Sequence, residues 1–318
     1  MSRKPYKATG RGKSPRGEET TARQGVIVAH LGVAVEVRFV DGERHPVRVK
    51  RSSGHVVGDS VLVRGEVLER LPRSTELRRR DSRGAVHLVG ANFDVLGVVV
   101  SPRPLPPAGF VDRAIVAARA AGLEPFLIVN KEDLDGASEL TAELRALYGA
   151  SLPVFSLSAK AGIGLEQLRQ FMAEGHRGAF VGTTGVGKSS LLNALCPDLA
   201  LAVGELNEDR GVGRHTTTVA TLHTLDGGGE LIDTPGFRDF GLVDIVVDEL
   251  IVHFPGFEQA MMARCRFRDC QHRAEPGCAV TALVKKGALA EDRYRAYLEL
   301  LSEIEVAQDE ARRREWKN

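Results

Sequence analysis

The chain has 318 residues, 43% of them hydrophobic and 27% charged, with 43 Lys and Arg against 42 Asp and Glu. This length predicts about two domains, and the ordinary composition excludes a collagen-like chain. The longest apolar stretches fall far short of the roughly 18 residues that span a bilayer, and no apolar segment follows the basic N-terminus as it would in a secretory signal. Four cysteines do not make a disulfide framework, so we expect a cytoplasmic protein without membrane contact.

The net charge is only +1, but the chain contains two local clusters of basic residues. Residues 1–24 carry seven Arg and Lys against two acidic residues, and residues 70–83 carry six Arg against two acidic residues. Clusters of this kind indicate docking on a polyanion, with a solvated tail and a solvated linker as the alternative. Because residues 1–24 show no hydrophobic period, we expect them to form a disordered basic arm.

Residues 25–71 have the pattern of short β-strands. Apolar and polar residues alternate over 33–39, and Asp41-Gly42 supplies a hairpin turn. Further strands are expected over 45–50 and 59–64. The series predicts a small barrel of the OB-fold class, which often binds nucleic acid, although a purely structural barrel is the alternative.

After a Pro- and Arg-rich segment at 72–91, which we interpret as a linker, strands and helices alternate over 92–253. Such alternation predicts a parallel α/β sheet. Residues 254–318 break this pattern, and 289–316 predict a charged helix with Leu298, Leu301 and Ile304 on one face. The expected strands are 94–101, 125–130, 152–157 and 178–182, and the expected helices are 112–121, 137–148, 165–173 and 188–195.

Residues 182–189 match the phosphate-loop pattern G-x-x-x-x-G-K-[ST] between a strand and a helix. Backbone N–H groups and the helix N-terminus would surround the phosphates, Lys188 would reach the β- and γ-phosphates in a catalytic role, and Ser189 would ligate Mg²⁺. A strand–helix turn without ligand is the alternative. The expected nucleotide-binding residues are Gly182, Thr183, Thr184, Gly185, Val186, Gly187, Lys188, Ser189 and Ser190.

Two further segments, each after an apolar strand, indicate which base is bound. Beside the phosphate loop they resemble the guanine-specificity element of small GTPases, whereas the first of them alone would be read as an exposed loop. The resemblance implies that Asp133 accepts hydrogen bonds from guanine, that Asn130 orients the loop, and that the stem of Lys131 lies over the ring. It also implies that the backbone N–H of Ala159 meets O6, so adenine would be rejected. The segments are Asn130-Lys131-Glu132-Asp133 and Ser158-Ala159-Lys160.

A D-x-x-G motif and a threonine-rich segment supply the expected magnesium and catalytic residues. Asp233 opens the motif, which ends at Gly236, and would hold Mg²⁺ through water. Within the switch-like segment 213–218, Thr217 is the best candidate to close on Mg²⁺ and the γ-phosphate. Ras-like enzymes orient the attacking water with a glutamine after D-x-x-G, but Phe237 occupies that position here. His215 is the candidate to replace the glutamine, with a switch-stabilising or RNA-contacting histidine as the alternative.

The order of these motifs differs from that of an ordinary small GTPase. There the phosphate loop comes first and N-K-x-D follows D-x-x-G. Here N-K-x-D and S-A-K precede the phosphate loop, and D-x-x-G comes last. The chain therefore looks like a circularly permuted GTPase, in which the residues after Gly236 follow directly on the γ-phosphate sensor.

Three of the four cysteines fall in one short segment together with a histidine. Four such ligands suit one tetrahedral structural zinc, and unligated cysteines or a disulfide are the alternatives. Cys196 lies apart and is interpreted as a core residue. The candidate zinc ligands are Cys265, Cys270, His272 and Cys278, and the arginines between and beside them, which could face nucleic acid, are Arg264, Arg266, Arg268 and Arg273.

The complete arrangement resembles the RsgA/YjeQ family of GTPases that depend on the small ribosomal subunit. The resemblance implies a multi-domain fold, with an N-terminal OB-fold β-barrel, a circularly permuted α/β P-loop GTPase domain and a C-terminal α-helical zinc-binding domain. It further implies slow hydrolysis of GTP to GDP with Mg²⁺, stimulated by the subunit, and a monomer that binds ribosomal RNA and assists late subunit maturation. The corresponding division is 1–24 arm, 25–71 OB-fold, 72–91 linker, 92–253 GTPase and 254–318 zinc-binding helices.

Two other functions remain open at this point. One is a GTP-binding RNA chaperone or sensor whose hydrolysis is incidental. The other is a metabolic nucleotide kinase that uses the same phosphate loop. The guanine-type motifs and the permuted order argue against the kinase, because a kinase has no need of this switch layout.

Overall fold

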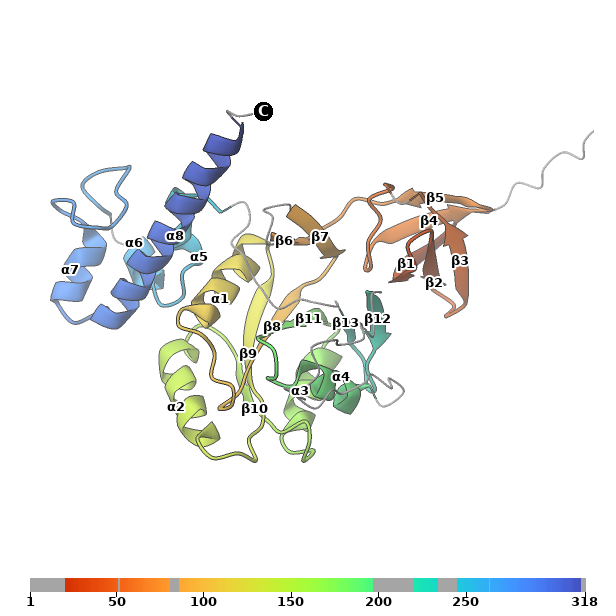
Figure 1. The fold of residues 1–318 in the computed structure, drawn as a ribbon, viewed down its shortest axis with the longest axis horizontal. Coiled ribbons are helices and arrows are strands. Elements are labelled where there is room, and N and C mark those ends of the chain that lie inside the picture. The colour runs from red at the N-terminus through yellow and green to blue at the C-terminus, as the bar shows by residue number, and fades with distance from the viewer. Residues whose placement is uncertain are drawn as a thin grey trace, which may run out of the picture.

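A computed structural model describes residues 21–50, 52–80, 86–196, 220–233, 245–262 and 264–315. A unit of N-terminal strands and a unit of C-terminal helices lie on opposite sides of a central α/β sheet (Figure 1). Within these residues, no helix combines the length and the apolar composition that crossing a membrane requires.

The N-terminal β-unit consists of antiparallel strands around a core of its own. The alternation predicted around residues 33–39 is confirmed, because Val35 and Val37 are fully buried between partly exposed neighbours. The first strand begins at Arg23, inside the predicted arm, and residues 1–20 of that arm lie outside the described residues. The strands are β1 (Arg23–His30), β2 (Ala34–Phe39), β3 (Arg44–Arg48), β4 (Ser60–Arg64) and β5 (Val67–Arg70).

The central sheet has helices on both faces, as the alternation of elements predicts. Strand β8 is buried on both sides: Val98 and Val100 pack with α1 and α2, whereas Val95 and Val99 pack with α3 and α4. The strands are β8 (Val95–Val100), β9 (Glu124–Val129), β10 (Val154–Ser156), β11 (Arg177–Val181), β12 (Thr221–Thr224) and β13 (Glu230–Asp233). The helices are α1 (Phe110–Ala120), α2 (Ala137–Tyr148), α3 (Leu165–Ala173) and α4 (Lys188–Leu195).

Two features of the sheets differ from the sequence prediction. The order β10-β9-β8-β11-β13 is parallel throughout, but β12 pairs antiparallel with β13, so the sheet is mixed. The predicted linker is wrong over its second part, because β6 (Glu76–Arg80) and β7 (Val86–Ala91) form an antiparallel pair whose Leu77 is buried against the central core. The arginines of β6 obscure its apolar alternation, and the pairing with β7 has no local signature.

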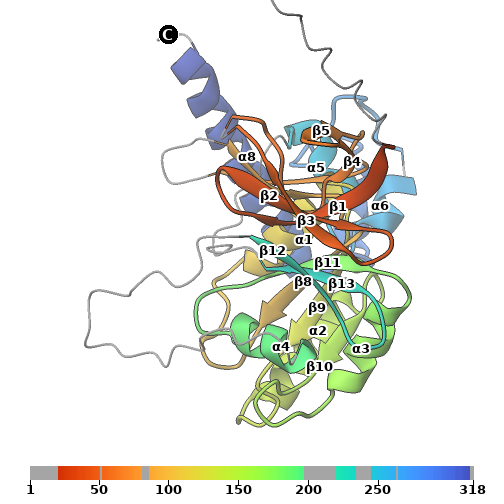
Figure 2. The ribbon, with the colours of Figure 1, turned by 90° about the vertical axis from the view of Figure 1, so that its right-hand side faces the viewer.

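The N-terminal β-unit continues the central sheet. Strand β1 pairs antiparallel with β12, with Ala29 opposite Thr221, so the described strands run β10-β9-β8-β11-β13-β12-β1-β2-β3. In the view of Figure 2, β1 and β2 accordingly lie beside β12 and β13. The two units are therefore joined by backbone hydrogen bonds as well as by the chain between them.

The C-terminal helical unit packs around aromatic residues. Phe254, Phe257 and Tyr297 contact one another through their rings. Leu301 and Ile304 are buried and Leu298 is partly buried, which confirms the predicted apolar face of the last helix. The helices are α5 (Leu250–His253), preceded by a 3-10 turn (Val247–Glu249), α6 (Glu258–Met262), α7 (Ala279–Lys285) and α8 (Glu291–Glu315).

Candidate nucleotide and metal sites

The phosphate loop lies between the end of β11 and the start of α4. Gly185 and Gly187 have φ angles of 85° and 94°, a conformation that glycine adopts without steric cost. At Gly182 a Cβ atom would lie 2.4 Å from the carbonyl oxygen of Val99, so no larger residue fits. Lys188 Nζ donates to the carbonyl oxygens of Gly182 at 2.5 Å and Thr183 at 3.1 Å, which places the ammonium group against the loop.

Asn130 connects the three nucleotide motifs. Its side chain is buried, and Nδ2 donates to the carbonyl oxygen of Val186 at 2.8 Å, while Oδ1 accepts from the N–H of Ala159 at 3.0 Å. One amide therefore joins the N-K-x-D segment, the S-A-K segment and the phosphate loop. The structure brings together segments that are 29 and 56 residues apart in the chain.

Lys131 adds a second connection to the phosphate loop. Its Nζ donates to the carbonyl oxygens of Gly185 and Arg103, both at 2.6 Å. Burial lowers the pKa of Lys131, and the nearby carboxylate of Asp133 opposes that shift. The aliphatic stem of Lys131 therefore spans the space between N-K-x-D and the loop.

Asp133 is held in its charged form. Ser158 Oγ donates to Asp133 Oδ1, and this hydrogen bond lowers the pKa of Asp133 below its ordinary value. Ser158 is itself fully buried, and its Oγ accepts from the N–H of Ala161 at 3.1 Å. The exposed carboxylate is thus prepared to accept hydrogen bonds from a base, while Glu132 and Lys160 border it with exposed side chains.

Asp233 lies at the end of β13, beside the strand that leads into the phosphate loop. Burial raises the pKa of Asp233, and the positive charge of Lys188 opposes that shift. The two side chains therefore interact electrostatically. Hydroxyl and carboxylate oxygens suit Mg²⁺, and Ser189 and Asp233 supply them in this region. The other expected residues, His215, Thr217, Gly236 and Phe237, lie outside the described residues.

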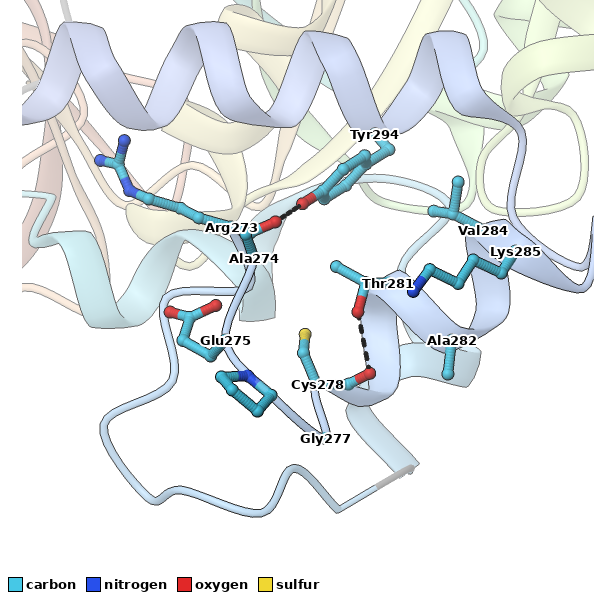
Figure 3. Close-up of a pocket in the computed structure, with 11 residues that line it drawn as sticks. Arg273, Ala274, Glu275, Gly277, Cys278, Thr281, Ala282, Val284, Lys285 and Tyr294 are labelled. Carbon is cyan, nitrogen blue, oxygen red and sulfur yellow. Dashed lines mark hydrogen bonds between the residues drawn. The ribbon is translucent and has the colours of Figure 1, made fainter.

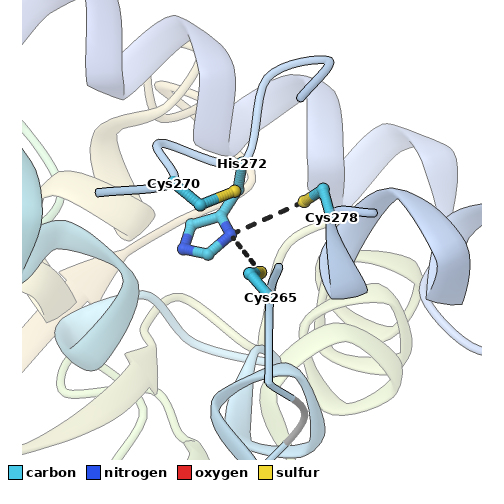
Figure 4. A group of neighbouring side chains, drawn as sticks. All are labelled: Cys265, Cys270, His272 and Cys278. Atoms are coloured by element: carbon cyan, nitrogen blue, oxygen red, sulfur yellow. Dashed lines mark hydrogen bonds between the residues drawn. The ribbon is translucent and has the colours of Figure 1, made fainter. Parts of the chain in front are cut away.

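The four candidate zinc ligands converge. The ligand atoms of Cys265, Cys270, His272 and Cys278 all lie within 4.8 Å of one another (Figure 4). His272 Nδ1 lies 3.5 Å from Cys265 Sγ and 3.7 Å from Cys278 Sγ. Ligands about 2.3 Å from a tetrahedral zinc are separated by ~3.8 Å. The geometry and the donor set therefore fit one zinc ion.

The surroundings of this cluster affect both the charge and the position of its ligands. Burial and the neighbouring thiols raise the pKa of Cys270 to about 12, so the protonated form dominates unless a cation stabilises the thiolate. The backbone N–H of Ala279 donates to Cys265 Sγ at 3.3 Å, and Tyr294 donates to the carbonyl oxygen of His272 at 2.7 Å. Tyr294 also lines a pocket beside Cys278, together with Arg273 and Lys285 (Figure 3). The sequence pattern did not single out Tyr294, because its role depends on α8 packing over the ligand loop.

Known proteins are similar to this chain over most of its length. A family model described as RsgA GTPase matches residues 70–243. The small ribosomal subunit biogenesis GTPase RsgA of Pseudomonas fluorescens (strain SBW25) is 41% identical over 303 residues, which cover 91% of this chain and 88% of that protein. The protein of the same name from Pseudomonas aeruginosa (strain LESB58) is 39% identical over 298 residues, covering 91% of this chain and 87% of that protein.

Two solved structures share the fold. YjeQ from Thermotoga maritima has a TM-score of 0.71 and 30% identity, covering 89% of this chain and 98% of that chain. YloQ, described as a circularly permuted GTPase, has a TM-score of 0.68 and 27% identity, covering 92% of this chain and 98% of that chain. The likeness therefore extends over most of the three units described above.

Proposed function

The chain belongs to the RsgA GTPase family, and we propose that it binds the small ribosomal subunit in the cytoplasm and assists its late maturation as a GTP hydrolase. Hydrolysis yields GDP and phosphate and is stimulated by the subunit. The observation that carries this proposal is the position of Asn130, which holds both base-recognition segments against the phosphate loop. A loop that only bound phosphate would not need this connection.

Each described residue has a definite part in the proposed reaction. Asp133 accepts hydrogen bonds from the guanine base, the N–H of Ala159 meets O6, and the stem of Lys131 covers the ring. Lys188 exchanges its carbonyl partners for the β- and γ-phosphates. Ser189 and Asp233 would hold Mg²⁺, and the ion bound with GTP would neutralise phosphate charge.

We assign the N-terminal β-unit to the OB-fold class. Its described strands have the order β3-β2-β1-β4-β5, which fits a five-stranded, partly open barrel. Exposed basic side chains on it, such as Arg48, Lys50 and Arg64, would contact ribosomal RNA. This assignment ends the first domain near Arg70, so β6 and β7 belong with the GTPase domain, whose core includes Leu77.

Within the zinc-binding unit, residues 254–318, we infer a second RNA-binding surface on the loop between Cys265 and Cys270. A zinc ion on Cys265 and Cys270 would fix the loop between them, which carries exposed Arg266, Phe267 and Arg268. Arginine planes and aromatic rings bind single-stranded RNA by stacking. The two surfaces flank the GTPase domain, so one monomer would contact the subunit at both ends.

Turnover of GTP with and without purified small subunits tests this function, and large subunits serve as the control. We expect slow turnover alone and a large increase that only small subunits produce. An unchanged rate with an excess of small subunits would favour a GTP-binding RNA chaperone whose hydrolysis is incidental. Turnover of ATP as fast as GTP would contradict the assignment of the base.

A further inference from the structure

A charged side-chain bridge joins the N-terminal β-unit to the central sheet. Arg38 of β2 makes an ion pair with Glu230 Oε1, and its Nη1 donates to Thr224 Oγ1 at 2.6 Å. On the other side, Arg177 Nε donates to Glu230 Oε2 at 2.6 Å. One carboxylate therefore bonds with arginines from two different units, and we call Arg38, Glu230 and Arg177 the arginine–glutamate bridge.

The bridge is too shielded to count as an ordinary surface pair. The side chains of Arg38, Glu230 and Arg177 are 21%, 17% and 21% exposed. Burial by itself raises the pKa of Glu230, but the hydrogen bonds and charges of the two arginines outweigh it and lower the pKa. Glu230 is therefore charged at neutral pH, and water screens its ion pairs less than those on an open surface.

The bridge holds the strands that position the nucleotide site. Glu230 is the first residue of β13, which ends at Asp233, and Arg177 is the first residue of β11, which leads into Gly182. Arg177 and Glu230 are also partners in the parallel register of these strands. Three strand residues span about 10 Å, so the bridge does not touch the nucleotide and acts only through the strands.

Backbone pairing runs alongside the bridge. The N–H of His30 donates to the carbonyl oxygen of Ala220, and Ala29 lies opposite Thr221 in β12. Strand β12 in turn pairs with β13 along its length, with Thr221 opposite Asp233. A displacement of the N-terminal β-unit therefore reaches Asp233 by two routes, the β12 pairing and the bridge.

We propose that the arginine–glutamate bridge transmits docking of the N-terminal β-unit on the small subunit to Asp233, so that Arg38 is a positioning residue for subunit-stimulated hydrolysis. The inference rests on the proposed function. When the subunit holds the β-unit in one orientation, Arg38 fixes Glu230 and narrows the positions that β13 adopts. Asp233 then spends more time where it supports Mg²⁺ and the γ-phosphate. Without the bridge, the β-unit docks equally well, but its orientation no longer determines that of β13.

Arg38→Met tests the inference, because it keeps an unbranched apolar stem of similar bulk and removes the charge and the donors. We expect unchanged GTP affinity, unchanged basal turnover and unchanged affinity for small subunits. At saturating subunits, kcat should fall about tenfold, the size of a typical coupling between sites. Arg38→Lys should restore part of the stimulation, since an ammonium group still pairs with Glu230. Glu230→Gln should reproduce the loss, because it keeps the shape and removes the charge.

Arg44→Met is the matched control. Arg44 lies opposite Arg38 in the β2–β3 register and pairs within the same unit, at 3.5 Å from Glu36. It should keep the wild-type stimulation at saturating subunits. The inference would be overturned if small subunits stimulated Arg38→Met fully, or if Arg38→Met and Arg44→Met lost equal amounts of stimulated turnover. Either result would leave the proposed function intact. Wild-type protein without any stimulation would overturn the proposed function and the inference together.

Discussion

Arg293 of α8 and Asp112 of α1 form a buried, two-point ion pair, with Nη1 2.9 Å from Oδ2 and Nη2 2.7 Å from Oδ1. Tyr148 of α2 donates its hydroxyl to the same carboxylate at 2.9 Å. Burial and the charge of Asp112 raise the pKa of Tyr148, which therefore remains protonated and a donor. These contacts attach the C-terminal helical unit to the helices of the central sheet.

We expect Arg293→Met to lower the free energy of unfolding by about 3–5 kcal/mol, because it leaves the Asp112 carboxylate buried without a counter-charge. Tyr148→Phe should cost about 1–3 kcal/mol, since one donor to that carboxylate is removed. Urea unfolding followed by circular dichroism measures both values. Arg113→Met is the control: its pair with Glu303 joins the same two helices but is 31% and 43% exposed, so a decrease below about 1 kcal/mol is expected. Equal decreases in the free energy of unfolding of the two variants would contradict the prediction that the buried ion pair contributes more than the exposed one.

Asp133→Asn should weaken GTP binding and improve binding of xanthosine triphosphate, because an amide offers a donor where the carboxylate offers an acceptor. Titration of the wild type and the variant with GTP and with xanthosine triphosphate measures this change in base preference. Ser158→Ala should raise the pKa of Asp133 towards its ordinary value, since it removes the hydrogen bond that lowers that pKa. As the pH is lowered, Asp133 of that variant should be protonated earlier, so its GTP affinity should begin to fall at a higher pH than in the wild type. ATP binding as tight as GTP binding would refute the guanine assignment.

Metal analysis of the purified protein should find about one zinc per chain, and Cys270→Ser should lose it. Zinc affinity should rise with pH, because the thiols must release their protons to bind the ion. Cys196→Ala should retain the zinc, since Cys196 is buried outside the cluster. The zinc site would be rejected if metal-free protein were well folded and still docked on the subunit.

Charge reversal of Arg78, Arg79 and Arg80 on β6 should weaken binding to the small subunit without changing nucleotide affinity. The slope of binding against salt concentration should also fall, by about one for each phosphate that the variant no longer neutralises. Reversal of Arg312, Arg313 and Arg314 near the end of α8 removes the same number of positive charges elsewhere. If both triple variants bind the small subunit equally weakly, the affinity depends on the total charge and not on the position of the arginines. If neither variant binds more weakly than the wild type, the β6 arginines do not contact the subunit.

His215→Ala should bind GTP and the small subunit normally but lose most of the stimulated turnover. The reason is chemical: a neutral imidazole can orient a water, whereas Phe237 has no hydrogen-bonding atom in its side chain. Both residues lie outside the described part of the chain, so this prediction rests on their place in the motifs. Phe237→Ala should have the smaller effect. Full stimulation of His215→Ala would instead indicate a catalytic group supplied by the ribosome.

The nucleotide motifs were predictable because each depends on a local requirement. The phosphate loop needs glycine where φ is positive, as at Gly185 and Gly187, and it needs a strand before it and a helix after it. The alternation over 94–195 likewise specifies strand and helix through the period of buried residues. Such signals lie within a few neighbouring positions and can be recognised in a single chain.

The connections between units were decided only in three dimensions. Arg38 and Glu230 are 192 residues apart, and neither has a neighbour in the sequence that marks it as a partner of the other. The β6–β7 pair and the antiparallel β12 were missed for the same reason, because strand pairing is chosen among distant segments by burial and hydrogen bonding. Amino-acid sequence alone thus determined which loops carry the phosphate, base and metal motifs, since those motifs depend on backbone conformation and donor type. How the N-terminal β-unit is attached to those loops was decided by tertiary packing. A partly buried charge such as Glu230 is stable only when a counter-charge from another part of the chain lies beside it.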